Sequence, residues 1–165
     1  MIVAGREGGA DGVRIVLETE EAMLLSELAD QVDSVLLLGG DDDPALGRLF
    51  PSAYPEDREA AHDFTRYTRD SLVDGKRQAA QSVRDATATE RDAGLVEIEL
   101  DQAQAWGWLT FLTDLRLILA ERVGVTDPDE AEPADDERDD YLRAAYEWAG
   151  IVQGSMLEVL DPIGR

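Results

Sequence analysis

The sequence contains no cysteine and a single histidine, His62. The absence of cysteine excludes disulfide bonds and a thiol-based switch within the chain. One histidine forms a metal site only together with a constellation of carboxylates, and no such constellation can be assembled from the sequence. We therefore expect no metal ion and no cofactor, and we interpret His62 as a surface or helix-stabilising residue rather than a catalytic base.

Positive charge is scarce. Fifteen basic residues face 37 acidic ones, which gives a formal net charge of −22. Such a charge repels nucleic acid, so direct binding to DNA or RNA is not expected. Lys76 is the sole lysine and asparagine is absent, a bias typical of a GC-rich genome. The acidity therefore has two open explanations, namely a function or the composition of a host that is adapted to salt.

Long apolar runs are also missing. The longest are residues 35–38 and the interrupted run 105–112, whereas a membrane span needs roughly 18 apolar residues. No secretory signal is visible at the N-terminus, so the sequence predicts a cytoplasmic protein. Apolar residues nevertheless make up 44% of the chain, enough for one hydrophobic core. The length fits a single domain over residues 1–165.

The periodicity of apolar residues predicts an α+β fold that is mostly helical. Two short strands within residues 1–17 surround a glycine-rich turn at 8–12, and residues 95–100 alternate like a half-buried strand. We expect a small antiparallel sheet from this N-terminal hairpin and the central strand, and Arg14 could pair with a glutamate of that strand. Four main helices are predicted at about 19–38, 56–87, 101–123 and 137–160. Thr19 is the expected N-cap of the first, Gly75 could interrupt the second, and one further turn is expected near 44–49.

The helix at 101–123 is expected to be the most buried element. Asp101 and Gln104 have the spacing of a capping box at its start. Apolar residues then form two stripes on opposite sides, a pattern typical of a helix packed between layers. We also expect the three tryptophans of the chain to be buried. The first stripe contains Trp108, Phe111, Leu112, Leu115, Ile118 and Leu119, the second Trp106, Leu109, Leu117 and Ala120, and the third tryptophan is Trp148.

Two acidic segments could attract cations. Asp41–Asp43 lacks the spacing of a calcium-binding loop, so solvated carboxylates are the favoured interpretation. Residues 124–137 contain proline and many carboxylates, and they predict an acidic, mobile loop. That loop is interpreted as a solubilising linker, with occupation of a basic partner surface as the alternative.

Motifs for catalysis are absent. The sequence has neither a Gly-x-Ser-x-Gly elbow nor a glycine-rich phosphate loop, and we predict that the protein is not an enzyme. The candidate residues for a polar cleft or interface are Arg48, Tyr54, Asp114 and Arg116. Asp114 and Arg116 lie on the two flanks between the apolar stripes, so each is expected to find a partner on another element.

Several stretches together resemble a known family. They are Arg48–Tyr54, Asp57–Ala60, Trp108–Leu119, Arg122–Val125 and Tyr146–Trp148, in that order. The pattern is similar to an actinobacterial family with a domain of unknown function, the AosR-like proteins. The resemblance implies genes for a Clp adaptor and for cysteine biosynthesis nearby, and a redox-responsive transcription regulator that acts with a sigma factor. Because that switch depends on cysteines, it cannot be transferred to this chain.

We interpret the protein as a regulator that binds other proteins. The candidate partner is a sigma factor or another transcription component, and the formation of a homodimer is left open. One alternative is a DNA-binding regulator that uses basic residues of the second helical region. Another is an enzyme or small-ligand binder with a cleft near Tyr54, Asp114 and Arg116. The basic candidates are Arg58, Arg66, Arg69, Lys76, Arg77 and Arg84.

Overall fold

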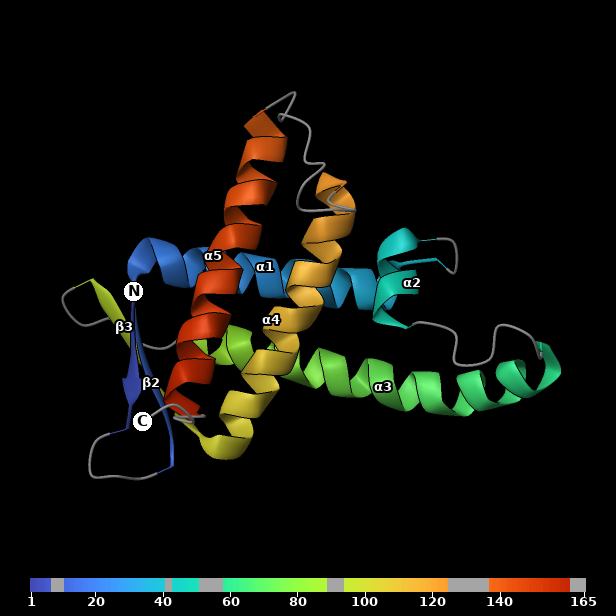
Figure 1. The fold of residues 1–165 in the computed structure, drawn as a ribbon, viewed down its shortest axis with the longest axis horizontal. Helices are drawn as coiled ribbons and strands as arrows, with labels where there is room; N and C mark the ends of the chain where they lie inside the picture. Colours follow the sequence, from blue (N-terminus) through green and yellow to red (C-terminus); the bar gives the residue numbers. More distant parts are fainter. Residues whose placement is uncertain (7–10, 41–42, 51–57, 89–93, 125–136, 161–165) are drawn as a thin grey trace.

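The computed structural model describes residues 1–6, 11–40, 43–50, 58–88, 94–124 and 137–160, with side chains in the second long helix from Arg69 on. The chain folds into a three-stranded sheet and a mostly helical body, which confirms the predicted α+β class (Figure 1). The elements are β1 (Ile2–Gly5), β2 (Gly12–Glu18), α1 (Thr19–Leu38), α2 (Pro44–Leu49), α3 (Arg58–Thr87), β3 (Leu95–Asp101), α4 (Gln102–Val123) and α5 (Glu137–Leu160).

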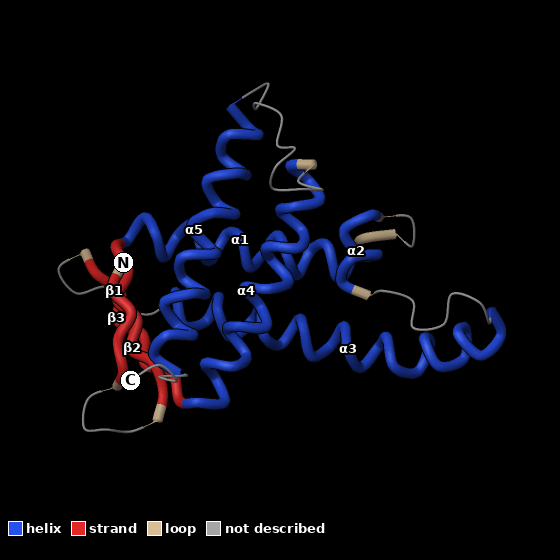
Figure 2. The backbone as a smooth tube through the Cα atoms, viewed as in Figure 1, coloured by secondary structure: helices blue, strands red, loops and turns tan. Residues whose placement is uncertain are grey.

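The sheet is antiparallel with the order β1-β2-β3, so the N-terminal hairpin pairs with the central strand as predicted (Figure 2). Alternation along β2 and β3 turns one face of the sheet to the core. On the other face, Arg14 pairs with Glu97 at 2.7 Å, a pairing expected from the sequence, and Arg6 pairs with Glu99 at 3.1 Å. The buried residues of the core face are Val13, Ile15, Leu17, Val96, Ile98 and Leu100.

Local signals set the starts of α1 and α4. Asp101 accepts a hydrogen bond from the Gln104 backbone at 2.8 Å, and the Gln104 side chain accepts one from the Asp101 N–H at 2.9 Å, which confirms the capping box. At α1 the N-cap is Glu18 rather than the predicted Thr19. The Thr19 hydroxyl instead donates to the Gly94 carbonyl at 3.0 Å and ties α1 to the start of β3.

The helix α3 runs without a break through Gly75, so the interruption considered there does not occur. A glycine in an exposed helix interior costs about 1 kcal/mol relative to alanine, too little to end a 30-residue helix that packs along α1. The first half of α3 projects away from the rest of the molecule (Figures 1 and 2).

The helix α4 packs against α5 on one side and against α1, α2 and α3 on the other. The first predicted stripe is buried throughout, from Trp108 at 0% exposure to Leu119 at 1%. In the second stripe Leu109 and Ala120 are buried, but Trp106 is 50% exposed, so its predicted burial is wrong. Trp106 and Trp108 are two positions apart in α4, so helix geometry turns them to opposite sides, and half of the Trp106 surface stays open to solvent. Trp148 of α5 is partly buried against the core.

The helix α5 begins and ends where the sequence predicts. Leu142, Ala149 and Met156 of α5 are buried, while Tyr146 and Leu160 pack against the core with part of their surface exposed. Gly124 ends α4 in the left-handed region at φ 70°, and most of the predicted acidic loop 124–137 lies outside the described residues. In the part of the chain that the structure describes, no helix is long and apolar enough to span a membrane.

Candidate interaction site

Asp114 of α4 is bonded to Lys76 of α3. The distance from Lys76 Nζ to Asp114 Oδ1 is 2.6 Å, and the side chains are 17% and 5% exposed, respectively. The second carboxylate oxygen of Asp114 is buried with no hydrogen-bond partner among the described residues. Burial raises the pKa of Asp114 above its usual value, and the hydrogen bond from Lys76 opposes that shift only in part. The ionised carboxylate of Asp114 is therefore kept inside the α3–α4 interface, and its loss of hydration lowers the stability of the fold.

Phe50, at the end of α2, has two cationic side chains of α3 over its ring. The Lys76 Nζ lies 5.8 Å from the centre of the Phe50 ring, and the Arg69 guanidinium lies 5.7 Å from it. These distances are within the range of cation–π attraction. The contacts join α2 to α3 on the side where Lys76 reaches Asp114.

Arg116 points from α4 towards α5 and binds neutral groups. It donates to Gln153 at 2.9 Å and to the Tyr146 hydroxyl at 3.1 Å, and its guanidinium lies 4.7 Å from the centre of the Tyr146 ring. Gln153 in turn donates to Thr113 at 2.7 Å. A network of this kind fixes the register of two packed helices.

The candidate cleft residues thus contact different neighbours. Asp114 binds α3, Arg116 binds α5, and Arg48 of α2 pairs with Glu121 of α4. Tyr54 lies outside the described residues. For Asp114 and Arg116, the predicted partners on other elements are present, and both flanks of α4 are filled by side chains of the protein itself.

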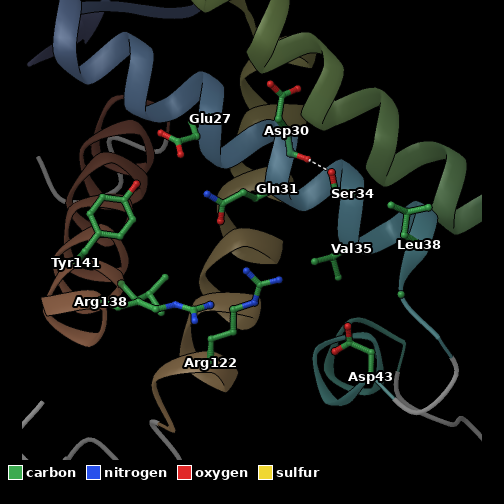
Figure 3. A pocket seen from close by; sticks show the side chains of 12 residues that line it. Glu27, Asp30, Gln31, Ser34, Val35, Leu38, Asp43, Arg122, Arg138 and Tyr141 are labelled. Carbon is green, nitrogen blue, oxygen red and sulfur yellow. Dashed lines mark hydrogen bonds between the residues drawn. The ribbon is translucent and has the colours of Figure 1, made fainter. Parts of the chain in front are cut away.

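A groove that the sequence did not indicate runs along the exposed side of α1. One end has a volume of about 730 Å³ and lies between α1, the end of α4 and the start of α5 (Figure 3). Arg122 and Arg138 reach into it from α4 and α5, and Val35 and Leu142 contribute apolar surface. We call this hollow and its continuation, described next, the α1 groove.

The continuation has a volume of about 740 Å³ and shares Glu27, Asp30 and Tyr141 with the first hollow. It extends towards the start of α1, where Met23 is 57% exposed, and at the opposite end of the groove Leu38 is 82% exposed. Exposed apolar side chains beside a groove with a polar rim are typical of protein-binding surfaces.

Glu27 lies near Tyr141 in the α1 groove. Partial burial and the nearby charge of Glu27 raise the pKa of the Tyr141 hydroxyl above its usual value. Asp43 contributes a further carboxylate at the end near α2, while Asp30 is paired with Arg84 of α3. The start of α1 has Glu20 on the same rim.

Many basic side chains of the described residues form ion pairs with carboxylates of the protein itself. Arg77 and Arg84 of α3 bind Asp33 and Asp30 of α1, each at 2.7 Å. The hydrogen bond to Asp33 raises the pKa of Arg77 above its usual value. Among the described residues, the basic side chains that form ion pairs in this way include Arg6, Arg14, Arg48, Lys76, Arg77 and Arg84.

Sequence reasoning missed the α1 groove because its lining comes from several segments that are far apart in the sequence: α1, the ends of α3 and α4, and the start of α5. A signal was present within α1, where Met23, Glu27, Gln31 and Leu38 follow a helical spacing on the side opposite the buried stripe. The wall of the groove opposite α1 depends on where the start of α5 is placed relative to α1. No local sequence pattern determines that placement. Among the described residues, no three acidic or histidine side chains are arranged to hold a metal ion.

Comparison with known proteins decides the family. The model of a domain of unknown function, DUF2017, matches residues 4–160, which is nearly the whole chain. This protein belongs to the DUF2017 family. It is also 32% identical over 126 residues to a Mycobacterium leprae protein named "Putative oxidative stress regulator AosR", an alignment that covers 68% of this chain. The chain spans only 56% of the length of that relative. No solved structure matches.

Proposed function

We propose that this DUF2017 protein is a non-enzymatic regulator that acts by binding another protein, with a component of the transcription machinery such as a sigma factor as the candidate partner. The observation that carries the proposal is the internal pairing of its cations, because it leaves carboxylates as the dominant charges offered to a partner. The similarity to a protein named as a stress regulator supports the regulatory role. Since this chain has no cysteine, an oxidative signal would reach it through the partner.

The α1 groove is the surface that suits such a partner best. Its apolar side chains Met23, Leu38 and Tyr141 are 57%, 82% and 42% exposed, and its rim is mostly acidic. A partner helix with an apolar stripe and basic flanks complements both properties. Aromatic and methionine side chains are also the kind that carries binding energy at the centre of interfaces.

The test is recovery of a partner from native lysate by tagged wild-type protein and by two variants. We expect wild-type protein to recover a stoichiometric partner and Met23→Glu to recover about tenfold less or none, because the substitution places a charge in the apolar part of the α1 groove. Ile151→Glu is the matched control, since Ile151 is 60% exposed on α5 and does not line the groove. Recovery of no partner at several salt concentrations, or equal recovery by Met23→Glu, contradicts the proposal.

The same protein should not bind DNA directly. Lys76, Arg77 and Arg84 were half of the basic candidates for a DNA-binding face, and all three are engaged with carboxylates. We expect no electrophoretic shift of duplex DNA at about 150 mM salt, where counterion release no longer compensates for repulsion by the protein. A sequence-dependent shift that persists at this salt concentration would make DNA binding the better account.

A further inference from the structure

The outer edge of β3 is free in the described part of the sheet, because β3 is the last strand and pairs with β2 only. The Thr19 N–H donates to the Gly94 carbonyl at 3.1 Å, just past the pair Glu18–Leu95. Hydrogen-bonded and non-hydrogen-bonded pairs alternate in an antiparallel ladder. The backbone groups of Val96, Ile98 and Leu100 therefore bind β2.

The alternate residues Glu97 and Glu99 consequently turn their backbone N–H and C=O groups to the open edge. Asp101 follows the same alternation, and its N–H is taken by Gln104 of α4. A row of unpaired backbone groups is a template for another strand, and proteins that leave such an edge open often use it to bind an extended peptide.

A groove with a volume of about 520 Å³ lies along this edge, between β3 and the second half of α3. Its wall on α3 carries small and uncharged polar side chains together with one carboxylate, so no bulky apolar group blocks the approach of a backbone. These residues are Gln78, Gln81, Ser82, Asp85 and Ala86.

The charge beside this edge is negative. Glu97 and Glu99 have side chains that are 58% and 53% exposed, and each uses its Oε2 atom for Arg14 or Arg6. Together with Asp85 and Asp101, the four carboxylates outnumber the two arginines and leave a local charge of −2. The face thus alternates from arginine to glutamate across the sheet, and a basic side chain on an added strand continues this alternation.

The geometry points to the β3 edge as a docking site for an extended basic peptide segment of a partner protein. Lysine or arginine at alternate positions would lie beside Glu97 and Glu99, and the residues between them would turn to Ser82 and Ala86 of α3. A second copy of this chain fits poorly, because pairing two such edges places glutamates opposite glutamates. The α1 groove is a separate surface, so this site stands or falls independently of it.

The experiment measures binding of the full chain to a synthetic peptide with alternating basic residues, acetyl-Lys-Val-Arg-Val-Lys-Val-Arg-amide. The charge-matched control contains the same residues in blocks, acetyl-Lys-Lys-Arg-Arg-Val-Val-Val-amide. Amide hydrogen exchange by NMR is the decisive measurement. In free protein we expect the Glu97 and Glu99 amides to exchange quickly and the Val96 and Ile98 amides to be protected. The alternating peptide should bind more tightly than the control and slow the exchange at Glu97 and Glu99 about tenfold or more. Binding without protection of these two amides, or equal binding of both peptides, overturns the proposal.

Two variants separate backbone pairing from charge. Glu97→Pro removes an N–H that points away from β2, so the ladder to β2 is preserved, and Glu97→Thr removes the same charge but keeps the N–H. We expect Glu97→Pro to bind the alternating peptide about tenfold more weakly than Glu97→Thr, with both variants folded by circular dichroism. Equal affinities of the two variants overturn the proposal. Protection of the Glu97 and Glu99 amides in free protein that grows with protein concentration also overturns it, because a second copy of the chain would then occupy the edge.

Discussion

Replacing Lys76 with methionine is expected to lower the free energy of unfolding by about 3 kcal/mol near neutral pH. Methionine keeps the apolar stem of the side chain but removes the ammonium group that lies 2.6 Å from Asp114. Asp114 is then a buried carboxylate whose second oxygen already has no partner among the described residues. Chemical denaturation measures the loss, and Arg84→Met on the same helix is the control, because its pair with Asp30 is exposed and its loss should leave the midpoint nearly unchanged.

The loss in Lys76→Met should depend on pH in a defined direction. Burial raises the pKa of Asp114 in the folded protein above its value in the unfolded chain. Folding is therefore favoured when Asp114 is protonated, and this contribution disappears as the pH rises through the folded-state pKa. Removing Lys76 raises that pKa further, so the difference between variant and wild type should be largest near neutrality and shrink in mildly acidic buffer. A difference that stays constant would show that Asp114 is not the cause.

A double variant separates the charge from the packing. Lys76→Met with Asp114→Leu removes both charges of this pair from the α3–α4 interface, and most of the lost stability should return, since apolar replacements of buried ion pairs are often neutral or stabilising. Stability that stays as low as in the single variant would instead indicate that the shape of the interface, rather than the unpaired carboxylate, was damaged.

Sequence patterns predicted the elements of this fold well because most of them carry two agreeing signals. The helix α4 has a capping box at Asp101 and a buried stripe, and β3 alternates strictly between glutamates and apolar residues. At α1 the predicted cap was one residue too late, since Glu18 holds the N-cap position and the Thr19 hydroxyl binds the Gly94 carbonyl. Gly75 was ambiguous for another reason, because a weak local preference competes there with packing along α1.

The polar contacts were less predictable than the elements. The flanking positions of Asp114 and Arg116 indicated that each needs a partner on another element, but not which one. Lys76 is 38 residues away from Asp114 in sequence, and its polar surroundings on α3 resemble an ordinary solvated face. The walls of the α1 groove and the open edge of β3 likewise depend on tertiary packing, so no local sequence pattern predicts them.

Trp106 and Trp108 provide the sharpest test of how α4 is packed. They are two residues apart on one helix, yet Trp108 is 0% exposed and Trp106 is 50% exposed. We expect Trp108→Ala to lower the free energy of unfolding by about 3–5 kcal/mol, because it opens a cavity in the hydrophobic core. Trp106→Ala should cost about 1 kcal/mol or less, since half of its ring is already in water.

Denaturation followed by far-ultraviolet circular dichroism measures both values without relying on tryptophan fluorescence. The buried Trp108 indole N–H has no hydrogen-bond partner among the described residues, so Trp108→Phe should recover much of the loss by refilling the cavity with a side chain that lacks this donor. A large cost for Trp106→Ala would contradict the exposed position of this face. It would mean that α4 is covered on both sides along its whole length, as its two apolar stripes suggested.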